Sequence, residues 1–462
     1  MLLRKKLRNN LGRVSIEQFV HNVDFLLEEI GKWGIIVPNS VYPPREDTEL
    51  ICSVLPQLTT KNGKAFEVGC GSGIVSIVLA SLGWEVTACD VNPMAVAATR
   101  GNVELNGLSD RVKVLESGIG EGALIPEKTD LLLWNIPYLD RIEELPEGIG
   151  EIEEASMSDI PNGGWGGELL SQISQGESAI ANKLVVILLM RTDPEGESKV
   201  SDWHARGWSS RSLNFKRMGG EKIEVFGLWK TGSGVEAKWL DSCNSTMDEA
   251  SKITEGGWQR VFSSKQTEGR GRGGSQWISQ PESVSATWNL EGGILGEVSP
   301  GLLQTSIGAT VSRCLDARMK WPNDIVSDDW RKMGGILLES SDNKKIRVGV
   351  GINKFSFEEG AVKGSGWMET IGNSGSEEVF EKIDCALSSL FEVNPIIGPL
   401  SEEYLVEISW NALSLLLSEG AMVSIEGEIM RPIGINLSGE LEAIGSEGVV
   451  SIGDLDVVKW LH

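Results

Sequence analysis

Residues 266–277 read QTEGRGRGGSQW, with glycine and arginine alternating from Gly269 to Gly273. This excludes a stable helix or strand, because glycine loses more backbone entropy on ordering than any other residue. The stretch is instead typical of a mobile loop that closes over an anion, since backbone N–H groups and the guanidinium groups of Arg270 and Arg272 suit phosphate or carboxylate. An RNA-binding tail rich in arginine and glycine is the alternative, but the flanking sequence is not repetitive. We therefore predict an anion-binding loop.

Further motifs accompany this loop in a set order. NSTMDEA precedes it at residues 244–250, while KWPNDI at 320–325, KMGGILLE at 332–339 and GVGIN at 349–353 follow it. In this order they resemble the biotin protein ligases. The resemblance implies that ATP, with Mg²⁺, activates biotin to biotinyl-5′-AMP, and that biotin then passes to a lysine of biotin carboxyl carrier protein. The alternatives are a lipoate-type ligase and a scaffold that holds the adenylate without transferring it.

Cations are needed at such a site, because adenylate formation crowds negative charge around the α-phosphate. We expect Lys320 to bridge the biotin carboxylate and the α-phosphate, and Arg272 and Arg270 to close over the same anion. Lys320 and Arg272 are the expected catalytic residues. The resemblance implies that Arg270, Lys332 and Asn353 bind ATP. It implies that biotin is bound by Ser245, Thr246, Met247, Gln266, Arg270, Gly271, Arg272 and Lys320.

A nucleotide-binding pattern lies in the first half of the chain. A short apolar run over 64–68 leads into the glycine-rich stretch GCGSG at 69–73, an apolar helix is expected over 74–82, and a second strand ends at Asp90. A strand, a glycine-rich turn, a helix and a strand ending in an acid are typical of a nucleotide-binding βαβ half. A dinucleotide site has the same pattern.

The stretch LLLWNIPY at residues 131–138 distinguishes the two kinds of site. It predicts a buried strand whose tip carries Asn-x-Pro-Tyr. Together with YPPREDTE at 42–49 and EVGCGSG at 67–73, it resembles the class I S-adenosylmethionine-dependent methyltransferases, and among them the release-factor glutamine N5-methyltransferases. An adenine N6-methyltransferase and an inactive methyltransferase-shaped domain are the alternatives.

The residues at this strand tip suit methyl transfer to an amide, whose nitrogen is a poor nucleophile because its lone pair is delocalised. Carbonyl groups of Asn135 and of the backbone at 136–137 can accept both amide hydrogens, and holding the two reactants this way supplies about 7–11 kcal/mol. We expect the acceptor at Asn135, Ile136, Pro137 and Tyr138, with Asn135 as the catalytic residue. The expected residues for S-adenosylmethionine are Thr48, Glu67, Gly69, Gly71, Asp90 and Asn135.

The composition narrows the classes of function. Asp+Glu number 66 against 42 Lys+Arg, and the net charge of -24 disfavours binding to DNA. Six scattered cysteines without a C-x-x-C pair and three histidines predict reduced thiols and no metal site. We find neither an apolar run of membrane-spanning length nor a secretory signal, so we expect a cytoplasmic protein without a membrane partner.

The expected fold class is an α/β Rossmann-like methyltransferase domain, followed by an α+β biotin ligase catalytic domain with a small C-terminal SH3-like β-barrel. We place the methyltransferase domain at 1–230, a linker at 231–236, the ligase catalytic domain at 237–417 and the SH3-like domain at 418–462. The resemblances imply three protein partners: biotin carboxyl carrier protein, a peptide-release factor and a small zinc-binding activator protein.

A helix is expected near the start of the chain. SIEQ at 15–18 has the form of a capping box, and apolar residues follow it at helical spacing from Phe19 to Ile30. Gly31 and Gly34 would then end the helix. We expect it to brace the domain that follows.

Overall fold

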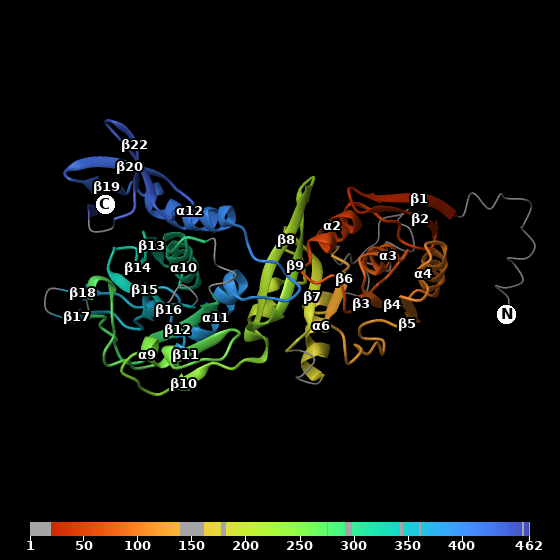
Figure 1. Ribbon diagram of the computed structural model, residues 1–462, viewed down its shortest axis with the longest axis horizontal. Coiled ribbons are helices and arrows are strands. Elements are labelled where there is room, and N and C mark those ends of the chain that lie inside the picture. Colours follow the sequence, from red (N-terminus) through yellow and green to blue (C-terminus); the bar gives the residue numbers. More distant parts are fainter. Residues whose placement is uncertain are drawn as a thin grey trace, which may run out of the picture. The chain divides into compact units, whose positions relative to one another are not determined.

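The computed structural model describes residues 20–138, 161–176, 182–274, 276–291, 298–341, 345–359, 362–454 and 457–461. The chain divides into two compact units, which Figure 1 colours along the sequence. The first unit extends to Arg206 and also takes Ser210–Lys230 and Pro395–Ile397. The second consists of Gly207–Ser209, Thr231–Asn394 and Gly398–His462.

A seven-stranded sheet forms the centre of the first unit, with the strand order β5-β4-β3-β6-β7-β9-β8 among the described residues. From β5 to β7 neighbouring strands are parallel, and β9 then pairs antiparallel with β7. The central strands β6 and β7 are buried except at their carboxyl ends, as expected for a parallel sheet covered on both faces. The strands are β3 Lys64–Val68, β4 Glu85–Asp90, β5 Val112–Glu116, β6 Leu131–Asn135, β7 Val185–Asp193, β8 Trp208–Met218 and β9 Glu221–Lys230.

Helices of the first unit follow the strands, and their starts have clear local causes. Asn92 caps α4, because its side-chain oxygen accepts the Met94 N–H at 2.9 Å and Pro93 occupies the first turn. Positive φ angles at Gly69, Gly71 and Gly73 form the turn before α3. The helices are α2 Glu46–Val54, η2 Leu55–Gln57, α3 Ile74–Ser81, α4 Pro93–Leu105, α6 Gly164–Gln175 and α8 Val200–His204.

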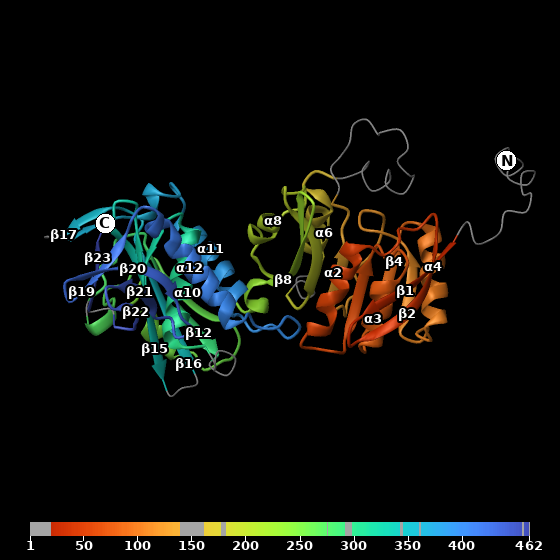
Figure 2. The same ribbon diagram turned by 90° about the horizontal axis from the view of Figure 1, so that it is seen from above.

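The helix predicted over 19–30 is wrong. The structure has an antiparallel hairpin of β1 (Val20–Leu27) and β2 (Gly31–Pro38), which packs against α4 and lies next to it in Figure 2. Asn102 of α4 binds the hairpin, since its side chain accepts the Ile36 N–H at 2.8 Å and donates to the Ile36 carbonyl at 2.9 Å. Burial at every second residue of β2 is the pattern of a strand, and the helical spacing upstream was coincidental. The capping box at 15–18 lies outside the described residues.

A nine-stranded sheet dominates the described part of the second unit, in the order β10-β11-β12-β16-β15-β14-β13 with β17 and β18 attached beside β15. Most neighbouring strands are antiparallel. The strands are β10 Lys238–Leu240, β11 Gln259–Ser263, β12 Val284–Glu291, β13 Arg318–Lys320, β14 Asp324–Val326, β15 Lys332–Ser341, β16 Lys345–Ile352, β17 Phe357–Glu359 and β18 Val362–Gly364.

Helix α11 packs on the sheet through a buried polar cluster around its Asp384. One carboxylate oxygen accepts the indole N–H groups of Trp258 and Trp288 at 2.7 and 2.8 Å, and the other accepts from Arg260 at 2.9 Å. Because every charge in the cluster is paired, α11 is held firmly against β11 and β12. The helices are η3 Thr231–Gly234, α9 Thr246–Ser251, η4 Arg272–Gly274, α10 Pro300–Cys314, η5 Trp367–Glu369, α11 Ser376–Phe391 and α12 Glu402–Ser418.

The C-terminal part of the second unit is a five-stranded antiparallel sheet in the order β22-β21-β20-β19-β23. Trp321, from the KWPNDI motif, donates its indole N–H to the Gly439 carbonyl at 2.9 Å and so ties the motif to this sheet. The strands are β19 Met422–Ile425, β20 Glu428–Ile435, β21 Leu441–Gly445, β22 Gly448–Ile452 and β23 Val458–Leu461.

Candidate active sites

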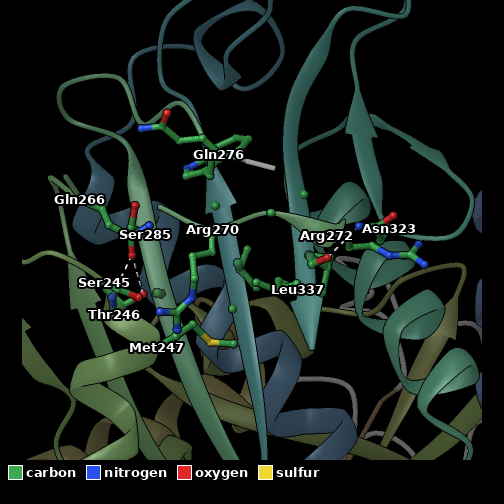
Figure 3. Close-up of a pocket in the computed structure, with 18 of the residues that line it drawn as sticks. Ser245, Thr246, Met247, Gln266, Arg270, Arg272, Gln276, Ser285, Asn323 and Leu337 are labelled. Carbon is green, nitrogen blue, oxygen red and sulfur yellow. Dashed lines mark hydrogen bonds between the residues drawn. The ribbon is translucent and has the colours of Figure 1, made fainter. Parts of the chain in front are cut away.

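A cavity of about 300 Å³ opens in the second unit beside the glycine- and arginine-rich loop (Figure 3). Its walls come from α9, β12, β14, β15, β16 and the loop at 266–277. It therefore brings together all of the motifs that the sequence singled out in this half. The lining residues are Ser245, Thr246, Met247, Gln266, Arg270, Gly271, Arg272, Gln276, Trp277, Ser285, Ala286, Asn323, Asp324, Lys332, Gly335, Ile336, Leu337, Gly349, Val350 and Gly351.

Most of the residues expected to bind biotin or ATP line this cavity, but two do not. Lys320 and Asn353 are absent from the lining, whereas Lys332 and Arg270 are present. Sequence reasoning gave no role to Asp324, Trp277 or Gly349. All three residues belong to the motifs already singled out, and this membership could have identified them from the sequence.

Gln266 is fixed by the start of α9. Its side-chain oxygen accepts the Thr246 N–H at 2.9 Å and the Thr246 hydroxyl at 3.1 Å, and that hydroxyl in turn accepts from Thr287 at 2.9 Å. Because two donors occupy the oxygen of Gln266, its NH₂ group is the end that can donate to a ligand.

Glycines in β16 form the floor of the cavity. A Cβ atom at Gly351 would lie 2.7 Å from the Trp277 ring, and one at Gly349 would lie 3.1 Å from the sulfur of Met247. Glycine at these two positions of the GVGIN motif therefore leaves room for the side chains of Trp277 and Met247.

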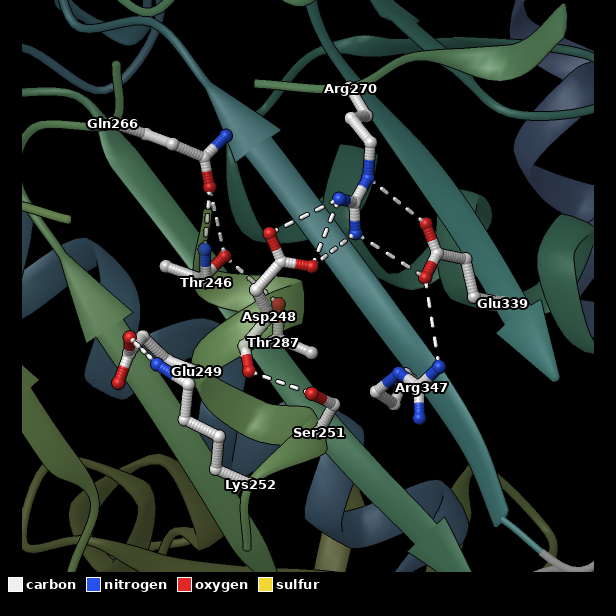
Figure 4. Close-up of polar contacts among 10 residues, drawn as sticks. All are labelled: Thr246, Asp248, Glu249, Ser251, Lys252, Gln266, Arg270, Thr287, Glu339 and Arg347. Atoms are coloured by element: carbon white, nitrogen blue, oxygen red, sulfur yellow. Dashed lines mark hydrogen bonds and ion pairs between the residues drawn. The ribbon is translucent and has the colours of Figure 1, made fainter. Parts of the chain in front are cut away.

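Arg270 is held between two carboxylates (Figure 4). Its guanidinium donates to Asp248 at 2.9 Å and pairs with Glu339 at 3.3 Å, and Glu339 lies 3.7 Å from Arg347. The hydrogen bond to Asp248, aided by Glu339, raises the pKa of Arg270. Much of its charge is already compensated, so the geometry makes Arg270 an anchor for the base of the loop.

Asp324 separates the two lysines of this site. Its carboxylate lies 2.6 Å from the Lys332 ammonium and 3.7 Å from that of Lys320 on β13. The Lys332 side chain is 49% exposed and borders the cavity, while Lys320 approaches Asp324 from the neighbouring strand. Lys332 is thus the lysine whose position suits contact with a bound anion.

Asn353 supports the chain that follows the loop. It is fully buried, its side-chain oxygen accepts from the Gln280 N–H and the Ser283 hydroxyl, both at 3.0 Å, and its NH₂ donates to the Ile278 carbonyl at 3.3 Å. All of these contacts are to residues 278–283.

A second candidate site lies at the carboxyl ends of β3, β4 and β6 in the first unit. Asp90 ends β4, and its two oxygens accept the Gly71 and Asn92 N–H groups, both at 2.9 Å. Burial raises the pKa of Asp90. It also raises the pKa of Glu67 to about 8, although the Ser76 hydroxyl donates to this carboxyl. The expected residues Gly69 and Gly71 stand in the intervening turn with positive φ.

Asn135 ends β6 at the same edge. Its NH₂ group donates to Asp47 of α2 at 2.9 Å, and its side-chain oxygen is buried without a hydrogen-bond partner among the described residues. Thr48 follows Asp47, so the motif at 42–49 does reach this strand tip. Tyr138 is half-buried, and burial raises its pKa, so the phenol is neutral.

The described residues hold no group of three or more His, Cys, Asp or Glu side chains that could bind a metal ion. Nor does the described part of the chain contain a helix with the length and apolar character needed to cross a membrane.

Comparison with known families gives each unit a class. Residues 45–156 match the sequence model of the ribosomal protein L11 methyltransferase (PrmA) family, and residues 239–353 match that of the biotin/lipoate A/B protein ligase family. The chain therefore joins a methyltransferase-like segment to a segment similar to the biotin and lipoate protein ligases.

Individual relatives follow the same division. A release factor glutamine methyltransferase of Rhodopirellula baltica is 33% identical over 131 residues, 26% of this chain and 44% of the relative. A provisionally described protein N5-glutamine methyltransferase of Methanocaldococcus jannaschii is 34% identical over 105 residues, 22% of this chain and 50% of the relative. The solved biotin protein ligase from Aquifex aeolicus, in complex with biotin and ATP, aligns over 49% of this chain and 99% of its own, at 21% identity and a TM-score of 0.37. The chain spans half or less of the curated relatives it matches.

Proposed function

We propose that the second unit is a biotin protein ligase, which forms biotinyl-5′-AMP from biotin and ATP and passes biotin to a lysine of a biotin carboxyl carrier protein. The observation that carries this proposal is the convergence of widely separated motifs on one cavity of about 300 Å³. The match of residues 239–353 to the ligase family supports it. The GRGRGG and KWPNDI motifs favour biotin over lipoate.

In the first step a biotin carboxylate oxygen attacks the α-phosphorus of ATP. A new P–O bond forms, the bond to the β-phosphate breaks, and pyrophosphate leaves. Lys332, Arg270 and Arg272 are cations that line the cavity. Arg270 is already paired with Asp248 and Glu339, so we assign Lys332 and Arg272 to offset the crowded charge. We assign Lys320 to the same step through Asp324, and Asn353 to support of the chain at 278–283 that follows the loop. Mg²⁺ brought by ATP would find oxygen donors that suit it on Asp324 and Asn323.

In the second step the carrier lysine attacks the carbonyl carbon of the adenylate. A C–N bond forms, the C–O bond to AMP breaks, and the amine loses a proton to water. The adenylate is a reactive mixed anhydride, so we assign the loop at 266–277 to shielding it until the carrier arrives.

The test is mass spectrometry after the full chain is incubated with ATP, biotin and a biotin carrier domain. We expect one added biotin on the carrier lysine. Addition of lipoate but not biotin favours the lipoate-type ligase, and an adenylate that forms but never transfers favours the scaffold.

We propose that the first unit binds S-adenosylmethionine and methylates a side-chain amide, with a glutamine of a peptide-release factor as the acceptor. The carrying observation is the buried oxygen of Asn135, which has no donor among the described residues and stands ready for an N–H group. S-adenosylmethionine supplies an electrophilic methyl group, and its sulfur keeps the electron pair of the broken C–S bond. Asn135 and the backbone at 136–137 hold the acceptor nitrogen, whose surplus proton leaves to water.

Calorimetry with S-adenosylhomocysteine is the first test, and Asp90→Ala should weaken binding. Methylation of a release factor, given with its small zinc-binding activator protein, is the second. The L11 family match makes ribosomal protein L11 the rival acceptor. An adenine oligonucleotide is the remaining alternative acceptor. If the chain does not bind S-adenosylhomocysteine at all, the domain is inactive.

We also propose the finer architecture. The parallel order of β5, β4, β3, β6 and β7 supports a Rossmann-like methyltransferase domain at 1–230. The antiparallel sheet of β19–β23 supports an SH3-like barrel at 418–462, after a linker at 231–236 and a catalytic domain at 237–417. Both activities use cytoplasmic substrates, so we place the protein in the cytoplasm.

A further inference from the structure

Asp47 is a buried acid at the methyltransferase site that the proposed reaction does not yet use. It lies in the first turn of α2, is 4% exposed, and meets the tip of β6. One oxygen accepts the Thr48 N–H at 2.7 Å and the other accepts the Asn135 NH₂ at 2.9 Å. Burying a carboxylate costs free energy unless the carboxylate is paired or hydrogen-bonded. Asp47 is therefore a candidate for a function in this site.

The charge of Asp47 decides which way Asn135 faces. A carboxylate can only accept hydrogen bonds, so the end of the Asn135 amide that faces it must be the nitrogen. The side-chain oxygen must then point the opposite way. That oxygen is buried and receives no hydrogen bond from any described residue. Buried acceptors in folded proteins nearly always have a donor, so this one awaits a ligand N–H group.

We propose that Asp47 is a positioning residue: it fixes the Asn135 amide with its oxygen toward the methyl acceptor, and thereby selects acceptors that present an NH₂ group. The proposal rests on the proposed methyltransferase function of the first unit. An NH₂ group has two hydrogens, one for Asn135 and one for the backbone carbonyl at 136–137. An acceptor with a single hydrogen cannot fill both places.

The negative charge of Asp47 also favours the reaction itself. The acceptor nitrogen gains positive charge as the methyl group arrives, and Asp47 stands one hydrogen-bonded residue away. Asp47 also affects Tyr138. Burial is the main cause that raises the pKa of the Tyr138 phenol, and the charge of Asp47 raises it further. A neutral ring at Tyr138 suits stacking on a flat amide.

Asp47→Asn tests the proposal, because this substitution keeps the shape but can present an NH₂ group to Asn135 and free its orientation. We expect kcat for the release-factor acceptor, with its activator, to fall roughly 10- to 100-fold, since small misplacement at a reacting centre has effects of this size. Affinity for S-adenosylhomocysteine should fall by less than kcat does. Thr48 and Asn135, which Asp47 contacts, are also expected cofactor residues, but the Asn135 oxygen that Asp47 orients is assigned to the acceptor. Glu49→Gln, which removes an exposed acid from the same helix turn, is the matched control.

A paired exchange adds a stricter readout. Asp47→Asn together with Asn135→Asp restores one donor and one acceptor in exchanged places, so it should recover part of the activity lost by Asp47→Asn alone. A purely structural role for Asp47 predicts no such recovery. Wild-type kcat in Asp47→Asn, or a loss of S-adenosylhomocysteine affinity equal to the loss of kcat, overturns the proposal.

NMR of the Asn135 side-chain NH₂, assigned by its absence in Asn135→Ser, needs no acceptor. We expect Asp47→Asn to shift this signal and speed its hydrogen exchange, and Glu49→Gln to leave it unchanged. An unmoved signal overturns the positioning role. A wild-type chain that binds no S-adenosylhomocysteine or methylates no acceptor refutes the proposed function instead, and the NMR result then still decides whether Asp47 orients Asn135.

Discussion

At the scale of single residues, Asp324 determines how the two lysines of the ligase cavity differ. It holds the Lys332 ammonium at 2.6 Å and lies 3.7 Å from that of Lys320, and Lys332 alone of the two lines the cavity. A carboxylate at this distance holds the ammonium in place. We therefore propose that Lys332 meets an incoming phosphate directly and that Lys320 acts on it through Asp324.

Lys332→Ala should lower pyrophosphate release roughly 100- to 1,000-fold, the usual effect of removing one group that stabilises transition-state charge. Lys320→Ala should lower it less, because Lys320 acts through Asp324. Lys363→Ala, which removes an exposed lysine paired with Glu358 on the edge of β18, is the control. A larger loss in Lys320→Ala than in Lys332→Ala would return the central role to Lys320.

Glu67 should make the first unit more stable at low pH. Burial raises its folded pKa from 4.5 to about 8. Between these values the folded unit holds a proton that the unfolded chain has released, so this contribution is fully present below about 4.5 and is lost as the pH rises toward 8. Glu67→Gln should raise the melting temperature of this unit increasingly from pH 5 to pH 8. Parallel melting curves for the variant and wild type would contradict the assignment, and Glu85→Gln at the exposed start of β4 is the control.

At the scale of elements, the glycine- and arginine-rich loop is fixed at its base by Arg270. Arg270 is tied to Asp248 and Glu339, whereas Arg272 lies two residues further, within η4, and lines the cavity. We therefore propose that Arg270 anchors the loop and that Arg272 contacts the ligand. This division of work could not be seen in the sequence, where the two arginines have the same glycine neighbours.

Asp248→Asn should loosen the closed loop and let biotinyl-5′-AMP escape. The neutral side chain cannot pair as strongly with Arg270, so the loop opens more often while the cavity stays intact. We expect diffuse biotin labelling of lysines on bystander proteins, as we also expect for Arg272→Gly. Glu255→Gln, in the chain after α9, should label only the carrier. If Asp248→Asn retains the adenylate as tightly as wild type, Arg270 does not anchor the loop.

The elements that the sequence predicted are those with a strong local pattern. The strand at 64–68, the apolar helix after it and the buried strand before Asn135 are all confirmed. The β1–β2 hairpin, which packs against α4 far along the chain, was missed, and the strand β8 (Trp208–Met218) was missed as well. In the sites, motif residues were found, but the contact of Asp47 with Asn135 joins residues 88 positions apart, and no local pattern encodes it. Asp324 stands only four residues after Lys320 in the same motif, so its role was missed although a local signal was present.

At the scale of the whole molecule, each of the two units is built from more than one segment of the chain, so no single cut separates them. Pro395–Ile397 belongs to the first unit, although it stands deep within the sequence of the second. Ile396 and Ile397 are buried in the core of the first unit, together with Val225 and Trp229 of β9. Separate production of residues 1–230 would therefore leave out part of that core.

Ile397→Ala should destabilise the first unit of the intact chain. The Ile397 side chain fills the space above Gly227, where a Cβ atom would lie 2.7 Å from its terminal carbon, so truncation leaves a cavity against β9. Such a cavity costs about 2–5 kcal/mol. Hydrogen exchange should therefore show weaker protection in peptides from β7 and β9 and unchanged protection in β19–β23. Ile433→Ala, at a 42% exposed position of β20, should alter neither set. Unchanged protection of β9 in Ile397→Ala would mean that the first unit is complete without residues 395–397, and that a cut after Lys230 separates two self-sufficient folds.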